Sequence, residues 1–230
     1  MRLARSAARA VIPDALVPVA AERLQGRPAA RTAIRAARAG QRVEAPRVAY
    51  RPLVRMLAGD CHSVLDIGTG LMRSLAELPC PVRIGLEAHR PYLEHREVGD
   101  AVPLNASAAD LERLFVADAV DLVQLIDVLE HFDPDQADAV LAQAERIARK
   151  RVLLFTPRGE FPQEDFDSSG LGGEELQRHR STWEPEDLER RGYRVVVMAD
   201  FHGPWNEAFV AGFGADAPPV DALLAFKDAG

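Results

Sequence analysis

Short apolar runs follow one another from residue 63 onward. Each is four or five residues long and continuously apolar, which is typical of a parallel strand that is covered on both faces. The five runs span residues 63–67, 82–86, 101–104, 122–126 and 152–155. Pro103 in the third run lacks a backbone donor, so we expect this run to lie near an edge of the sheet.

Helical patterns fill the gaps between these runs. The clearest covers residues 134–149, because Asp133 can cap it, Pro134 suits its first position and Gln136 completes a capping box. A shorter helix is predicted over residues 184–192. Strands and helices therefore alternate along this part of the chain.

Two further strand candidates, residues 195–198 and 222–226, follow without a long helix between them. This ending predicts an α/β fold with a doubly wound, mostly parallel sheet of seven strands and an antiparallel edge strand. Residues 58–230 would form this domain. Within it, residues 157–184 are too long for a simple connection, so we expect them to form a lid or an acceptor-binding segment.

Residues 1–57 differ in composition from the rest of the chain. They are rich in Ala and Arg and predict a helical cap of two or three short helices, with breaks at Pro13, Pro18, residues 26–28 and Pro46. A solvated cap and a helix lying on a membrane surface both fit this pattern. The Arg-rich start also fits an organellar transit peptide.

Charge divides the chain in the same way. Residues 1–55 hold twelve Arg and three acids, a net of +9, whereas the remainder holds 16 basic and 32 acidic residues, a net of −16. An acidic main domain argues against binding of long nucleic acid, which depends on basic side chains. No apolar stretch approaches the roughly 20 residues of a membrane span, so we expect a cytoplasmic protein. Cys61 and Cys80 fit neither a disulfide framework nor a zinc site.

A glycine turn, Asp66-Ile67-Gly68-Thr69-Gly70, follows the first apolar run. Its two glycines permit positive φ angles and a close approach of backbone to ligand. Dinucleotide-binding folds use a similar turn, but Arg73 stands where their third glycine would be. Asp66 suits a ligand with an ammonium group better than a pyrophosphate. The turn alone indicates only a nucleotide-like ligand.

Glu87 ends the second apolar run, nineteen positions after Gly68. An acid at this point can accept hydrogen bonds from both ribose hydroxyls, as in other nucleoside-binding sheets. A solvated glutamate at a strand end is the simpler alternative. The position of Glu87 after an apolar strand favours ribose binding.

Together these segments resemble the class I S-adenosylmethionine-dependent methyltransferases, over roughly residues 60–200. Residues 64–70 look like the family's first motif, and Glu87 looks like its ribose acid. Residues 121–132 contain the D-V-L-E-H sequence that many small-molecule members carry after the fourth strand, and residues 155–157 also match. The resemblance implies a Rossmann-like sheet and S-adenosyl-L-methionine as the cofactor.

The resemblance also implies which residues contact the cofactor. They are Asp66, Gly68, Thr69, Gly70, Glu87, Ala88, Ser107, Ala108, Ile126 and Asp127. Many members end the third strand with an Asp that binds the adenine amine, whereas this chain has residues 105–108, Asn-Ala-Ser-Ala, at that place. We therefore assign adenine contact to Ser107 and to the backbone of Ala108.

The acceptor is indicated less directly. Residues 85–94 and 177–183 resemble uncharacterised methyltransferases of type 11/23 that often accompany polysaccharide or glycolipid biosynthesis. This favours O-methylation of a small molecule or of a sugar or glycan hydroxyl, which benefits from a positioned base. The candidate bases are His131, just beyond the fourth strand, and His179 in the predicted lid. A packing role for His131 and a surface position for His179 remain open.

Three other functions remain open. Methyltransferases acting on the 3′-terminal ribose of small RNAs carry an E-x-x-E-H motif and a later His, which together bind a divalent metal. The corresponding set here would be Asp127, Glu130, His131 and His179, with oxygen and imidazole ligands that suit Mg²⁺ or Mn²⁺. The main interpretation assigns no metal. A non-catalytic cofactor-binding scaffold and a nicotinamide oxidoreductase are the other two alternatives.

Overall fold

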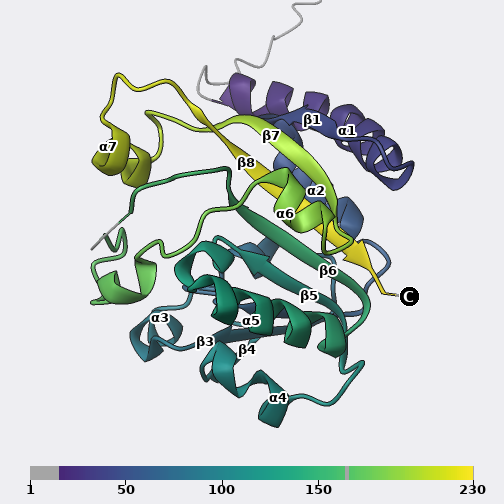
Figure 1. Ribbon diagram of the computed structural model, residues 1–230, viewed down its shortest axis with the longest axis vertical. Coiled ribbons are helices and arrows are strands. Elements are labelled where there is room, and N and C mark those ends of the chain that lie inside the picture. Colours follow the sequence, from purple (N-terminus) through teal and green to yellow (C-terminus); the bar gives the residue numbers. More distant parts are fainter. Residues whose placement is uncertain (1–15, 164–165, 230) are drawn as a thin grey trace, which may run out of the picture.

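The computed structural model describes residues 16–163 and 166–229. Eight strands form one sheet in the order β1-β7-β8-β6-β5-β2-β3-β4 (Figure 1). Neighbouring strands are parallel except at β8, which runs antiparallel to both β6 and β7. The strands are β1 (Val43–Pro46), β2 (Ser63–Ile67), β3 (Val82–Glu87), β4 (Val102–Asn105), β5 (Val120–Ile126), β6 (Ala148–Pro157), β7 (Arg194–His202) and β8 (Val220–Asp228).

Helices cover both faces of the sheet (Figure 1). The α-helices are α1 (Leu16–Arg38), α2 (Tyr50–Leu57), α3 (Arg90–Glu94), α4 (Leu111–Leu114), α5 (Pro134–Ile147), α6 (Pro185–Glu189) and α7 (Glu207–Phe213). The 3-10 helices are η1 (Arg47–Ala49), η2 (Arg73–Glu77), η3 (Ala108–Asp110), η4 (Leu129–His131) and η5 (Glu174–Gln177). Because successive strand residues point to opposite faces, Val64 joins the core with α2, and Leu65 joins the core with α5.

The predicted fold class is confirmed. The five apolar runs correspond to β2 through β6, and the last two strand candidates correspond to β7 and β8. Pro103 lies on β4, which is an edge strand, as its missing donor predicts. The capping box of Asp133 and Gln136 is present at the start of α5.

The sheet differs from the prediction in two details. It has eight strands rather than seven, because Val43–Pro46 pairs in parallel with β7. The antiparallel strand is not at an edge: β8 lies between β6 and β7. The segment 1–57 therefore contributes a strand to the sheet in addition to helices.

The expected breaks at Pro18 and at residues 26–28 are wrong. A single helix of 23 residues, α1, runs through them and contains Pro28. Buried alanines at helical spacing, Ala30, Ala33 and Ala37, join the same core cluster as α2, so tertiary packing outweighs the local preference of Gly and Pro. The break expected at Pro13 lies outside the described residues.

No helix in residues 16–163 and 166–229 combines the length and the apolar composition that would let it cross a membrane.

A substitution at Gly26 can test how closely α1 packs against η1. A glycine-to-alanine change inside a helix ordinarily stabilises it by about 1 kcal/mol. A Cβ atom on Gly26, however, would lie 2.2 Å from the carbonyl oxygen of Val48 in η1, and overpacking of this kind costs roughly 1–3 kcal/mol. We expect Gly26→Ala to lower the free energy of unfolding, measured by urea denaturation.

Gly99→Ala is the matched control, because a Cβ atom there would meet no atom within 4 Å. Its free energy of unfolding should stay within about 0.5 kcal/mol of the wild type. A Gly26→Ala protein more stable than the wild type would show that α1 does not pack against η1.

Candidate functional site

The site lies where the chain reverses its direction of progress across the sheet. From β2 the chain moves outward to β3 and β4, and it then returns to β5 on the other side of β2. In open α/β sheets ligands bind beyond the carboxyl ends of the strands at such a switch point. The carboxyl ends of β2, β3 and β5 are therefore the expected place for a ligand.

The loop after β2 packs tightly against β3. Gly68 has a φ of 67° and Gly70 a φ of 53°, the left-handed region that favours glycine. A Cβ atom on Gly68 would lie 2.6 Å from Cγ2 of Val128. The amide of Gly68 donates to the carbonyl of Leu86 at 2.8 Å, and the amide of Gly70 donates to Oε2 of Glu87 at 2.9 Å.

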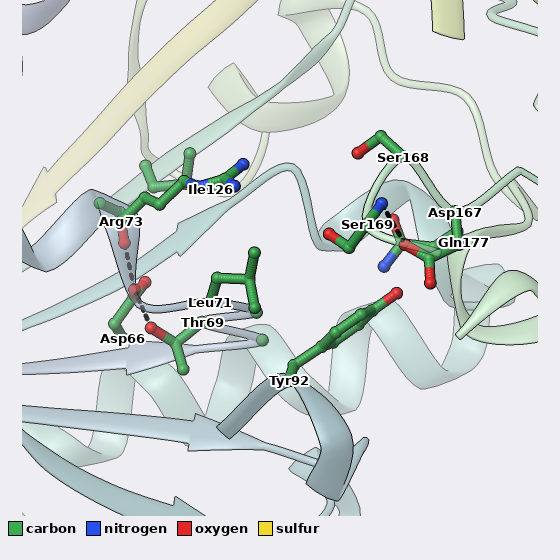
Figure 2. A pocket seen from close by; sticks show the side chains of 13 residues that line it. Asp66, Thr69, Leu71, Arg73, Tyr92, Ile126, Asp167, Ser168, Ser169 and Gln177 are labelled. Atoms are coloured by element: carbon green, nitrogen blue, oxygen red, sulfur yellow. Dashed lines mark hydrogen bonds between the residues drawn. The ribbon is translucent and has the colours of Figure 1, made fainter. Parts of the chain in front are cut away.

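Asp66 organises this loop from within. Its carboxylate is 1% exposed and accepts hydrogen bonds from the hydroxyls of Thr69, at 2.6 Å, and Ser74 (Figure 2). Burial raises the pKa of Asp66 to about 6, although the two hydroxyls favour the charged form. Asp66 therefore holds the loop in shape, in addition to lining the cavity beside it.

We name this small space the loop cavity. It measures about 170 Å³ and is lined by residues of the glycine loop, by Ile126 and by part of the segment 157–184 (Figure 2). Tyr92, Asp167 and Gln177 close it from the side opposite the loop. The sequence did not single out these three side chains, although Tyr92 and Gln177 lie in the stretches 85–94 and 177–183 that resemble other methyltransferases.

A second, larger space also borders the glycine loop at Gly68, and we name it the cofactor cavity. It measures about 720 Å³, and its lining includes the predicted residues Gly68, Glu87, Ala88, Ser107, Ala108 and Asp127. Ser107 also caps η3 by accepting the amide of Ala109 at 3.2 Å. The predicted ribose and adenine contacts therefore share one wall.

Glu87 is buried at this wall. Its Oε1 accepts the amide of His89 at 2.8 Å, while Oε2 accepts Gly70. Asn105, which the sequence analysis did not select, donates from Nδ2 to the carbonyls of Glu87 and Ala88 at 2.9 and 3.0 Å. Each carboxylate oxygen of Glu87 keeps acceptor capacity for a ligand hydroxyl.

Beyond β5 the chain enters the D-V-L-E-H turn. Asp127 has a φ of 53° and is open to the surrounding cavities. Enclosure within protein, and secondarily the nearby Glu130, raises the pKa of Asp127 well above its usual range. Glu130 is buried, and burial raises its pKa to about 7. Its Oε2 accepts the hydroxyl of Thr156 at 2.9 Å, whereas Oε1 has no partner in the described part of the chain.

His131 and His179 lie next to each other. Their ring centroids are 5.0 Å apart. Nδ1 of His131 lies 3.3 Å from the carbonyl of Arg178, and Nδ1 of His179 lies 2.7 Å from the carbonyl of Phe161. Because a carbonyl only accepts, each Nδ1 is the protonated nitrogen, which leaves each Nε2 with a free lone pair. Burial lowers the pKa of both rings, that of His179 to about 4, where His131 also contributes.

Glu130, His131 and His179 form a compact cluster. One ligand atom from each lies within 4.8 Å of the others. We name the adjoining space the cluster cavity; it measures about 190 Å³ and is also lined by Asp127. The structure thus brings together three of the four residues of the alternative metal set and places the fourth on the same cavity wall.

This donor set fits a divalent cation. Oε1 of Glu130 is buried without a partner in the described residues, and buried polar atoms of this kind require one; a carboxylate oxygen of Glu130 also lies within 4.8 Å of a ring nitrogen of each histidine. Backbone carbonyls fix both rings through Nδ1, as is usual for histidines that bind a metal. Mixed carboxylate and imidazole ligands suit Mn²⁺ or a later transition metal better than Mg²⁺.

The cofactor and cluster cavities adjoin. Asp127 and His131 line both of them. A group held in one cavity can therefore meet a group held in the other at these two residues. Gln177 also lines both cavities, so ligands held in the two spaces would lie next to each other.

The raised pKa of Asp66 has a measurable consequence. Its value in the folded protein, about 6, exceeds the ordinary value of 3.8. The stability that Asp66 contributes is therefore complete below about pH 3.8 and is lost as the pH rises through 6. Relative to Asp66→Asn, the wild type should lose up to about 3 kcal/mol of unfolding free energy across that window.

Urea denaturation of both proteins at half-unit pH steps measures this difference, and the exposed Asp216→Asn variant is the control. A difference between wild type and Asp66→Asn that stays flat from pH 4 to 6.5 would contradict the assigned burial of the carboxylate.

No protein-family model matches the sequence, and no curated protein matches it. Solved structures do match. A putative methyltransferase from Bacillus halodurans C-125 is similar with a TM-score of 0.53 and 14% identity, covering 78% of this chain and 97% of that one. The methyltransferase domain of bacterial CtHen1 is similar with a TM-score of 0.51 and 16% identity, covering 79% and 97%.

A third similar structure is the N-terminal domain of EvdMO1 with S-adenosylhomocysteine bound. Its TM-score is 0.50 at 14% identity, and the match covers 79% of this chain and 80% of that domain. At such low identity these likenesses define the fold alone. Together with the sheet order and the glycine loop, they show that this chain has the Rossmann-like fold of the class I S-adenosylmethionine-dependent methyltransferases.

Proposed function

We propose that this protein transfers a methyl group from S-adenosylmethionine to a hydroxyl of a sugar-like acceptor, at a site that holds a divalent cation. The observation that carries this proposal is the junction of the cofactor cavity with the cluster cavity at Asp127 and His131. A methyl donor on one side would meet a hydroxyl on the other. Positioning of the two reactants supplies much of the rate enhancement of such a displacement.

The cofactor would lie across the glycine loop. Glu87 would accept hydrogen bonds from both ribose hydroxyls, and the wall formed by Ser107 and Ala108 would contact the adenine. The methionine end would pass Gly68 toward the loop cavity, where Ile126 and Thr69 line the wall. S-adenosylmethionine supplies the methyl group as a sulfonium, so the chain needs only to bind and orient it.

The acceptor would occupy the cluster cavity. Its hydroxyl oxygen forms a bond to the methyl carbon as the bond from sulfur to carbon breaks, and its proton leaves to solvent or to a base. Glu130, His131 and His179 would hold the cation, whose charge lowers the pKa of a bound hydroxyl. In this arrangement both histidines are neutral ligands. Without a cation, His131, one of the two candidate bases in the sequence, would take the proton at Nε2.

A related function has a specific observation in its favour. Glu130, His131 and His179 come together in the way that the metal set of the small-RNA ribose methyltransferases requires. A terminal ribose presents the same vicinal hydroxyls as a free sugar. A scaffold without turnover is the third possibility, and it would bind the cofactor but transfer nothing.

Labelled S-adenosylmethionine separates these functions. The purified protein with Mn²⁺ is incubated with a set of sugars and glycans, with a short RNA, and with the same RNA lacking its 3′-terminal 2′-hydroxyl, and products are identified by mass spectrometry. Methylation of sugars alone supports the proposed function. Methylation only of the RNA with the intact terminal ribose favours the related function, and binding without any product favours a scaffold.

Glu87→Gln tests the cofactor site. It should weaken binding of S-adenosylhomocysteine roughly ten- to hundredfold, because hydrogen bonds to a charged group contribute about 1.5–3 kcal/mol. Isothermal titration calorimetry measures the change. Glu94→Gln is the control, since Glu94 is exposed and forms an i,i+4 ion pair with Arg90. Equal affinities of the wild type and Glu87→Gln for S-adenosylhomocysteine would show that Glu87 does not bind the ribose.

His179→Ala tests the cation. We expect the wild type with bound S-adenosylhomocysteine to take up one Mn²⁺, and His179→Ala and Glu130→Gln to bind it at least tenfold more weakly, because each variant removes one of three converging ligands. Titration followed by electron paramagnetic resonance measures free Mn²⁺. His62→Gln is the control, because His62 is exposed and outside the cluster.

Chelation gives an independent readout of the same cation. Treatment with a chelator should abolish methyl transfer, and added Mn²⁺ should restore it. Full activity after chelation would contradict the cation and would favour His131 as the base.

A further inference from the structure

A buried histidine outside the cluster also lines the cluster cavity. His202 ends β7, is 5% exposed, and lies beside Asn206, which lines the same cavity. Its ring packs against Phe161, with centroids 5.1 Å apart, and against Phe155, at 6.3 Å. Nothing in the proposed chemistry uses this side chain. Its hydrogen-bonding state, however, is fixed by its neighbours.

Asn206 determines which nitrogen of His202 carries the proton. The side-chain oxygen of Asn206 caps α7 by accepting the amide of Phe209 at 3.2 Å. The nitrogen of the same amide group, Nδ2, must then be the atom that lies 3.2 Å from Nδ1 of His202. Because an amide nitrogen only donates, Nδ1 accepts, and the proton of the neutral ring is on Nε2.

The proton on Nε2 is left without a partner. Nε2 is closed off from bulk water and makes no hydrogen bond within the described part of the chain. An unsatisfied buried donor costs about 1–3 kcal/mol. Burial, and secondarily His179, lowers the pKa of His202 to about 4, so the ring is neutral at neutral pH. The chain therefore maintains a neutral donor beside the cavity that the acceptor would fill.

We propose that His202 donates a hydrogen bond from Nε2 to an oxygen of the acceptor, and that it thereby selects a sugar ring. This inference rests on the proposed function. A sugar ring has polar oxygens at its rim and apolar C–H faces, and His202 would offer it a donor next to the aromatic ring of Phe161. The donor and the Glu130–His131–His179 cluster would hold two oxygens of the same ring.

The size of the cavity agrees with an organic ring rather than a single water. It measures about 190 Å³, whereas one water needs only about 10–15 Å³ of such space. An oxygen of the acceptor would accept the hydrogen bond from Nε2 of His202. The cation, to which the acceptor would also bind, would satisfy the free oxygen of Glu130.

Asn206→Asp gives the sharpest test. A carboxylate still caps α7 and has nearly the same shape, but it accepts from His202 instead of donating, so it moves the proton to Nδ1 and leaves Nε2 without one. His202→Phe removes the donor, and His202→Gln restores an N–H near the position of Nε2. The chain has six histidines, few enough to assign their imidazole resonances by NMR.

The experiment uses the full chain loaded with S-adenosylhomocysteine and diamagnetic Zn²⁺, with methyl β-D-ribofuranoside and methyl α-D-galactopyranoside as probes. In the wild type we expect the Nε2-protonated form of His202 and a shift of its Nε2 resonance on titration with one of the probes. Asn206→Asp and His202→Phe should bind that probe roughly tenfold more weakly, whereas His202→Gln and the control His62→Gln should retain binding. Affinity for S-adenosylhomocysteine should be unchanged throughout, which also verifies folding.

The outcomes that would contradict the role of His202 differ from the one that would contradict the proposed function. Protonation on Nδ1 in the wild type, equal probe binding by Asn206→Asp, or binding of neither sugar by a protein that binds S-adenosylhomocysteine would each overturn the role of His202. Loss of S-adenosylhomocysteine binding by the wild type would instead overturn the proposed function.

Discussion

The site depends above all on how closely the loop after β2 packs against β3. The amides of Gly68 and Thr69 both donate to the carbonyl of Leu86, at 2.8 and 3.1 Å. This approach requires Gly85 as well, because a Cβ atom there would lie 2.7 Å from the methyl group of Thr69. Since the amide of Gly70 then reaches Glu87, the glycine loop and this acid are positioned as one unit.

The Glu130–His131–His179 cluster is positioned by a different set of backbone contacts. The amides of Arg180 and Ser181 donate to the carbonyl of Glu130 at 2.7 and 3.1 Å, and this contact brings His179 to His131 although 48 residues separate them in the sequence. The amide of His179 is fixed in turn by the carbonyl of Gln163 at 2.9 Å. The residues around His179 are therefore a structural part of the cluster, and a variant that loosens these contacts would separate His179 from Glu130 and His131.

The sequence predicts those features of the fold and site that depend on neighbouring residues, and it misses those that depend on contacts between distant residues. Continuous apolar runs identify β2 to β8, and most of these strands are buried on both faces, although β4 is largely exposed. The strand Val43–Pro46 escapes because it is short and only Ala45 in it is buried. At the site, the glycine turn and Glu87 can be recognised in the sequence because each stands at the end of an apolar run, the turn after β2 and Glu87 at the end of β3. Asn105 and His202 are not visible, because their roles arise from contacts that only the folded chain makes.

The electrostatics of the site explain which ligands it suits. Asp66, Asp127 and Glu130 gather at one end of the sheet, and no ion pair in residues 16–163 and 166–229 supplies any of them with a basic partner. Their pKa values are raised because charge there is poorly solvated, so cations that enter would release protons and gain strongly from the carboxylates. A sulfonium, an ammonium group and a divalent metal all benefit from this field, whereas the pyrophosphate of a dinucleotide would be repelled. The charge of the site thus favours a methyl donor over a nicotinamide cofactor independently of the glycine pattern.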